Sequence, residues 1–217
     1  MAYPNYPEKG VVSRVAGSHY NRRISRRATC DMPRPTRIEG LAIVSADGML
    51  ADADGRMPKS LLVKADQQFF QDTLDQAAVL VQGRHSHEGS PRAAPRRRLI
   101  LSRRIAAIAE DTTYPNALLW NPKGATLQEA WDRLGAPDGM LAVIGGTEVY
   151  DLFLTIGYDR FHLSRAPHVR LPGGRPVFSE VGPGRTPEQV LEGHGLKPGP
   201  QHVFDAALGV AMVTWSR

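Results

Sequence analysis

Gly145 and Gly146 separate an apolar run, residues 141–144, from a helical segment that begins at Thr147. Free N–H groups and the positive end of the helix dipole meet at such a junction, so it can bind a phosphate. Residues without side chains also let a ligand approach the backbone closely. Strand-to-helix turns with two glycines are common as plain connections, so this pattern alone is only a weak indication of an anion site.

Two more strand ends carry side chains that suit an anion. Ligands of open α/β sheets bind at the carboxyl ends of the strands. Adjacent guanidinium groups beside a hydroxyl suit a phosphate monoester, such as the 2′-phosphate of NADPH. Each set alone could be a solvated turn, but together with the glycine pair they predict a ligand that contains phosphate. The two sets are Gly83-Arg84-His85-Ser86 and Ser102-Arg103-Arg104.

Asp66 is the candidate acid. In a helix predicted at residues 63–76 it shares one face with Phe70 and Thr73. A carboxylate in an apolar core would be costly, but in a pocket it could bind or help protonate a polar ring on which Phe70 packs. The alternative, an exposed aspartate near a helix N-terminus, fits the pattern equally well.

Eight apolar runs predict the strands that hold these residues in place. They alternate with helices predicted at 63–76, 126–134 and 147–156, which is typical of an α/β protein with a mostly parallel sheet and helices on both faces. Only residues 206–208 separate the last two strands, so these should form an antiparallel C-terminal hairpin. The predicted strands are 41–46, 78–82, 98–102, 117–120, 140–144, 160–164, 201–205 and 209–215.

Composition and charge indicate one globular domain behind a basic extension. The chain has 217 residues, 41% of them hydrophobic, and a net charge of +5, and this length suffices for a stable core. Residues 1–37 contain 8 basic and 2 acidic residues, a charge of +6, so residues 38–217 carry −1. We predict a disordered extension at 1–37 and a folded domain at 38–217, and we do not expect that domain to bind nucleic acid.

Several classes of protein are excluded on the sequence alone. A single cysteine, Cys30, excludes a disulfide framework and a zinc site made of several thiolates. His85 and His87 lack a third ligand at a suitable spacing, so no metal is expected. No segment approaches the roughly 18 apolar residues of a membrane span, and the first residues lack the apolar core that is expected of a secretory signal. We expect a cytoplasmic monomer or homodimer that binds a small molecule.

The ordered motifs resemble dihydrofolate reductase over residues 38–217. The resemblance implies a dihydrofolate reductase-like catalytic domain with an eight-stranded sheet, a nicotinamide cofactor, NADPH, and a mobile loop at residues 53–58 that closes over the nicotinamide. The motifs that carry it are SADGMLADADGRMP, ADQQFF, VLVQGRHSHE, RRRLILSRR, VIGGTEVY and RFHLSR.

The resemblance also assigns roles to single residues. Asp66 would be the catalytic acid, with the Ser164 hydroxyl hydrogen-bonded to it. Phe70 and Ile43 would bind the substrate, and Arg96 would bind the glutamate tail of folate. The glycine pair would be joined by a cis peptide. The implied cofactor-binding residues are Arg84, His85, Ser86, Ser102, Arg103, Arg104, Ile144, Gly145, Gly146, Thr147 and Tyr150.

The chain departs from the family at the substrate side. The usual Met-Pro-Trp of the mobile loop is Met57-Pro58-Lys59, and the Trp that often precedes the helix Phe is Phe69. Residues 45–48 resemble the related reductase domain of riboflavin biosynthesis. We therefore expect reduction of 7,8-dihydrofolate, with reduction of a ribosylaminopyrimidine as the alternative. A non-enzymatic protein that binds nucleotides or RNA through the basic extension is the further alternative.

Overall fold

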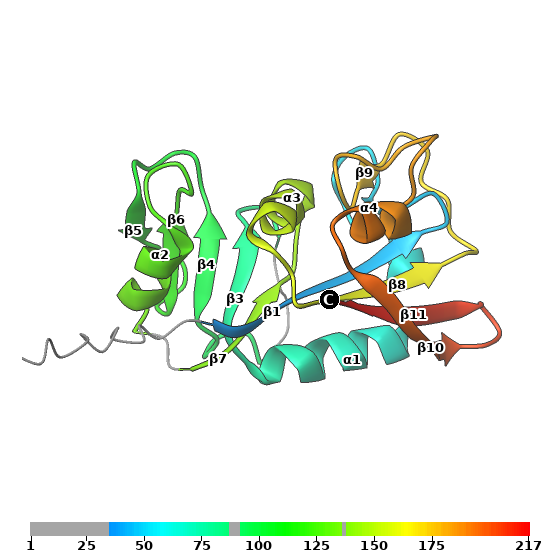
Figure 1. Cartoon of the computed structure of the whole chain (residues 1–217), viewed down its shortest axis with the longest axis horizontal. Helices are drawn as coiled ribbons and strands as arrows, with labels where there is room; N and C mark the ends of the chain where they lie inside the picture. Colours follow the sequence, from blue (N-terminus) through cyan, green and yellow to red (C-terminus); the bar gives the residue numbers. More distant parts are fainter. Residues whose placement is uncertain (1–34, 87–91, 136–137) are drawn as a thin grey trace, which may run out of the picture. The chain divides into compact units, whose positions relative to one another are not determined.

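A nine-stranded sheet forms the centre of the domain, with strand order β10-β11-β8-β1-β7-β3-β4-β6-β5 (Figure 1). This computed structural model describes residues 35–86, 92–135 and 138–217. The predicted extension lies almost wholly outside the described residues, as do Cys30 and His87. The strands of this sheet are β1 (Pro35–Ser45), β3 (Ala77–Gly83), β4 (Arg98–Leu101), β5 (Ile108–Glu110), β6 (Ala117–Trp120), β7 (Gly139–Val143), β8 (Arg160–Ala166), β10 (Lys197–Asp205) and β11 (Val210–Ser216).

The predicted α/β class and the C-terminal antiparallel hairpin, β10 with β11, are confirmed. All eight predicted strands are present, and the predicted count is one too low because β5 adds an antiparallel edge strand. A separate two-stranded ribbon joins β2 (Met49–Ala51) to β9 (Arg175–Pro176). Strands this short do not show a hydrophobic period, so the sequence pattern could not reveal them.

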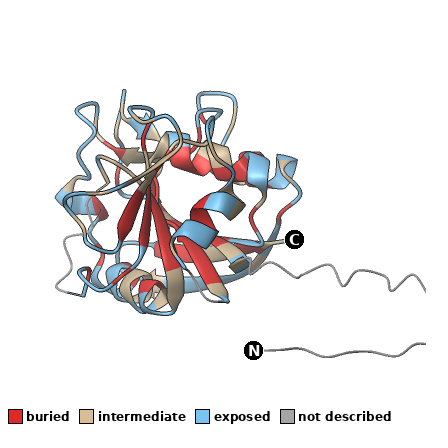
Figure 2. Cartoon of the chain, turned by 90° about the vertical axis from the view of Figure 1, so that its left-hand side faces the viewer, coloured by how far each residue is buried: buried red, intermediate tan, exposed pale blue. Residues whose placement is uncertain are grey.

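Helices cover both faces of the sheet (Figure 1). On one face, α1 (Lys64–Asp75) packs Leu74 against Leu80 and Ala142 of the strands. On the other face, α2 (Leu127–Arg133), α3 (Thr147–Ile156) and α4 (Pro187–Gly193) contribute to the largest apolar cluster. Figure 2 shows the central strands buried between these layers. A 3-10 turn, η1 (Lys59–Leu61), precedes α1.

The register of the parallel strands places the three predicted anion-binding segments at the same end of the sheet, where the carboxyl ends of the strands lie. Val81 of β3 is aligned with Val143 of β7, and Gly83 is aligned with Leu101 of β4. The glycine pair, the residues after Gly83 and the residues after Leu101 therefore all follow neighbouring strand ends. The sequence predicted three strand ends that together bind one ligand, and the strand order β7-β3-β4 makes these ends adjacent.

Candidate functional site

Asp66 and Ser164 form a buried polar pair between α1 and the sheet. Asp66 lies in the first turn of α1 and is 9% exposed, while Ser164 in the middle of β8 is 2% exposed. Burial raises the pKa of Asp66 to about 6, and the hydrogen bond from Ser164 opposes that rise. The exposed alternative for Asp66 is therefore wrong. Ile43, on β1, is aligned with Ser164 and is buried in the neighbouring apolar cluster.

Phe69 and Phe70 place two aromatic rings beside this pair. Phe70, one helical turn after Asp66, is half-buried against the apolar cluster under α1. Phe69 packs edge-on against His162, with ring centroids 5.3 Å apart. The Thr73 hydroxyl donates to the Phe69 carbonyl at 2.8 Å, so it is used within the helix. The inward face of α1 thus presents one carboxyl group among rings.

The glycine pair is shaped by its surroundings. The peptide bond between Gly145 and Gly146 is cis, as the resemblance implied. Gly145 has φ +99°, and a Cβ there would come within 2.7 Å of the Tyr150 ring, so a larger residue does not fit. The N–H of Gly83 donates to the Gly145 carbonyl at 2.8 Å, which joins two of the strand ends.

The start of α3 offers free space and N–H groups. A Cβ built on Gly146 would meet nothing within 4 Å. Gly146 is the N-cap of α3, and no side chain caps this helix. Thr147 uses its hydroxyl to hold β9, donating to the Pro176 carbonyl at 2.5 Å. An approaching phosphate would therefore find an open surface and the positive end of a helix, so these residues fit the pyrophosphate of a dinucleotide.

Tyr150 connects the glycine pair with the sheet. Its ring is 2% exposed, and its hydroxyl donates to the backbone carbonyl of Leu41 on β1. Burial and the nearby charge of Asp66 raise the pKa of Tyr150 far above the usual range, so the phenol stays protonated. Ile144, whose N–H donates to Val81 at 2.9 Å, leads the chain into this junction.

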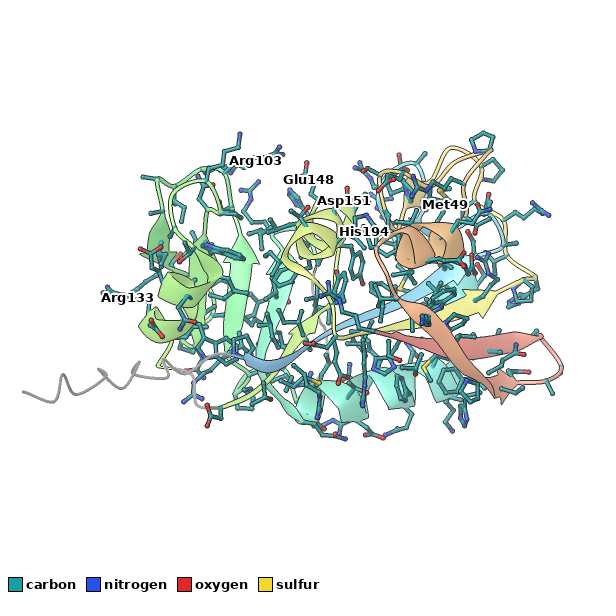
Figure 3. All side chains as sticks on the ribbon, viewed as in Figure 1. Met49, Arg103, Arg133, Glu148, Asp151 and His194 are labelled. Carbon is teal, nitrogen blue, oxygen red and sulfur yellow. The ribbon has the colours of Figure 1, made fainter. Side chains whose placement is uncertain are left out.

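The third strand end carries the basic residues. Ser102 is buried and its Oγ accepts from the N–H of Arg104 at 3.3 Å. The guanidinium of Arg103 is 3.1 Å from the carboxylate of Glu148, in the first turn of α3, and both side chains are exposed (Figure 3). Glu148 was not predicted as a site residue, because an acid in a first helical turn is ordinary.

The loop after β3 contributes the other predicted anion ligands. Arg84 and Ser86 are partly exposed and His85 is exposed. The N–H of Ser86 donates to the Gly83 carbonyl at 3.1 Å, which forms a tight turn. The three predicted anion-binding segments thus all lie at the carboxyl ends of neighbouring strands, where α3 also begins.

Solved structures of similar architecture identify the fold. A putative riboflavin biosynthesis protein from Shewanella sp. PV-4 is 17% identical, with 83% of this chain and 98% of that protein covered and a TM-score of 0.58. Dihydrofolate reductase from Enterococcus faecalis, complexed with NADP(H) and RAB-propyl, is 15% identical over 83% of this chain and 96% of its own, with a TM-score of 0.56. The chain has the dihydrofolate reductase-like fold.

A third structure with this fold belongs to a longer protein. The diaminohydroxyphosphoribosylaminopyrimidine deaminase/5-amino-6-(5-phosphoribosylamino)uracil reductase from Thermotoga maritima is 16% identical, with a TM-score of 0.58. The alignment covers 84% of this chain but 56% of that protein. No family model matches the sequence, and no curated protein matches it. At these identities the comparisons establish the dihydrofolate reductase-like fold alone.

Arg96 lies at the far end of α1 from Asp66. Its guanidinium bonds to Asp75, the last residue of α1, and is 3.3 Å from the Gln71 side-chain oxygen. Because Asp75 follows Asp66 by nine positions in the helix, the two residues are about 13 Å apart along the axis. The Arg96 side chain is 7% exposed. Arg96, which was predicted to bind the glutamate tail of folate, is thus already paired with a carboxylate of this dihydrofolate reductase-like domain.

A second buried polar cluster lies along β8 from Ser164. His162 is 3.0 Å from Glu39 of β1 through Nε2 and 3.0 Å from Thr214 of β11 through Nδ1. Burial raises the pKa of Glu39, but the hydrogen bond and charge of His162 and the charge of Arg37 outweigh it, so the net shift is downward. Sequence reasoning missed this cluster because its members are far apart in the chain.

The described residues contain no group of three or more potential metal ligands, and none of their helices is long and apolar enough to span a membrane.

Proposed function

We propose that the chain is an NADPH-dependent reductase that transfers hydride to a nitrogen heterocycle. The observation that carries this proposal is the buried Asp66 carboxyl, hydrogen-bonded to Ser164 on the same sheet whose strand ends carry the glycine pair. A carboxyl group with a pKa of about 6 can bind a protonated ring nitrogen or help to protonate one near neutral pH.

The chain's own residues would hold the cofactor at the strand ends. Gly146, which borders open space, and Thr147 would present backbone N–H groups to the pyrophosphate. Ser102 and Arg103 would hold the 2′-phosphate, which can accept hydrogen bonds from a hydroxyl and a guanidinium. When bound, the cofactor supplies the hydride, and the protein supplies orientation and exclusion of water.

Asp66 would act on the substrate side. Its position on α1, one turn before Phe70, lets the carboxyl group hydrogen-bond to a ring whose face packs on the phenylalanine. Ser164 orients the carboxyl by donating to it. Tyr150 stays neutral, and its hydroxyl would hold the backbone of β1 at Leu41 in place beside the site.

Two nitrogen heterocycles are candidates for the substrate. The resemblance favours 7,8-dihydrofolate, whose tail carboxylate would bind Arg96. The pairing of Arg96 with Asp75 favours the second candidate, a ribosylaminopyrimidine, because a substrate carboxylate would have to compete with an internal one. Two of the proteins with this fold carry riboflavin-biosynthesis or aminouracil-reductase names.

The test is NADPH oxidation by the purified protein, measured with dihydrofolate and with the ribosylaminopyrimidine in parallel. Turnover with dihydrofolate, weakened by Arg96→Leu but not by Arg92→Leu, would establish the folate reaction. Arg92 is the matched control because it pairs with the same Asp75 and is largely exposed. Turnover with the pyrimidine alone would establish the second candidate, and no turnover with either would refute both.

A further inference from the structure

The ion pair between Arg103 and Glu148 spans two of the three strand ends. Arg103 follows β4, and Glu148 lies in the first turn of α3, which follows β7 (Figure 3). Their side chains are 77% and 74% exposed, and the Arg103 Nη2 to Glu148 Oε1 distance is 3.1 Å. The pair is therefore exposed to solvent, and a ligand can reach both side chains.

Glu148 is the acid of α3 that is directed at the basic strand end. Asp151, one turn later in the same helix, instead accepts from the backbone N–H of Ser179 at 3.0 Å. An acid in the first turn stabilises the helix through its dipole. The same charge lowers the positive potential that an incoming phosphate would meet at Arg103 and at the start of α3.

We infer that Glu148 sets how strongly the site prefers a 2′-phosphorylated adenine nucleotide over the unphosphorylated one. This inference rests on the proposed function, because it takes Arg103 as the ligand of the 2′-phosphate. A 2′-phosphate has to compete with the Glu148 carboxylate for the Arg103 guanidinium, whereas a 2′-hydroxyl leaves the ion pair intact. Glu148 therefore weakens binding of the 2′-phosphorylated nucleotide. It thereby reduces the preference for this nucleotide that Arg103 provides.

The size of the effect follows from the exposure of the pair. Surface ion pairs contribute little and are screened by salt. Removing the Glu148 charge should thus change the preference by about 2- to 5-fold, and the change should shrink at high ionic strength. An effect through the helix dipole does not depend on Arg103, so a comparison of the affinity ratio with and without Arg103 isolates the part that passes through this residue.

The experiment measures binding of 2′,5′-ADP and of 5′-AMP to the full chain by calorimetry, without any substrate. Glu148→Gln should tighten 2′,5′-ADP relative to 5′-AMP by about 2- to 5-fold at low salt. Arg103→Gln should weaken 2′,5′-ADP selectively, and adding Glu148→Gln to it should leave the ratio unchanged, because the partner is gone. Glu192→Gln, an exposed charge change on α4, is the matched control.

The outcomes separate this inference from the proposed function. An unchanged ratio in Glu148→Gln, with both nucleotides still bound, would overturn the role of Glu148 and leave the reductase proposal intact. The same would follow if Glu148→Gln changed the ratio equally with and without Arg103. Failure of the unaltered chain to bind either nucleotide would overturn both proposals together.

Discussion

Asp66 combines a stability cost with a proposed chemical use. Its pKa is about 6 in the folded chain against 3.8 when unperturbed, so the folded state holds the proton more tightly than the unfolded state. The stability linked to that proton is fully present below about pH 4 and is lost as the pH rises through about 6. The apo protein therefore carries a destabilising ionised carboxyl at neutral pH.

Asp66→Asn should raise the free energy of unfolding at pH 7 by up to roughly 3 kcal/mol, the scale of a shift of about two pKa units. It should also flatten the dependence of stability on pH between about 4 and 6. Denaturant titrations at several pH values check both. Asp72→Asn, an exposed change on the same helix, should do neither, and an equal gain there would contradict the burial argument.

The same substitution should damage catalysis. Loss of the proton-holding carboxyl should lower turnover at neutral pH by roughly 100-fold or more. In the proposed reductase reaction, the rate of hydride transfer by the unaltered chain should fall as the pH rises above about 6, because the protonated acid is depleted. Stopped-flow pH profiles test this, and wild-type turnover in Asp66→Asn would remove this residue from the proposed mechanism.

At the scale of elements, a buried polar cluster joins three strands. Glu39, His162 and Thr214 lie on β1, β8 and β11. Breaking a buried pair leaves a partner unpaired, which costs far more than breaking an exposed one. The cluster thus fixes the lateral contact of the C-terminal hairpin with the parallel part of the sheet.

Glu39→Gln should lower the free energy of unfolding by about 3 kcal/mol at pH 7. Because the pKa of Glu39 is lowered in the folded chain, its contribution is present above its ordinary value of 4.5 and is lost as the pH falls through the folded value. Urea titrations measure the loss. Glu180→Gln, which breaks a more exposed pair with Arg185, should cost less than about 1 kcal/mol, and equal losses would contradict the burial argument.

The elements also show what the sequence could reveal. Long apolar runs and the Thr126 capping box predicted the main strands and α2 correctly, because local patterns determine them. The helix α4 was missed, although Thr186 and Gln189 form a capping box that could have identified it. The pairing of Arg96 with Asp75 was not predictable, since it depends on the end of α1 meeting a loop 21 residues away in the chain.

For the whole molecule, charge separates the two predicted parts of the chain. Residues 1–37 carry +6 and the remainder −1. If the extension alone binds polyanions, deleting residues 1–31 should abolish binding to heparin or RNA and leave NADPH oxidation unchanged. Filter binding and the reductase assay measure the two effects. Loss of NADPH oxidation on this deletion would show that the extension belongs to the functional enzyme.

The two adjacent glycines are constrained for different reasons, Gly145 by the packing of the fold and Gly146 only by a ligand. Gly145 is held by the Tyr150 ring, which leaves no space for a Cβ, so selection for folding alone would retain it. Gly146 borders open space, where the free chain tolerates a larger residue. In related proteins that keep the fold but no longer bind the ligand, Gly146 should therefore be replaced sooner than Gly145. The residue at position 146 would then indicate whether the site still binds its ligand.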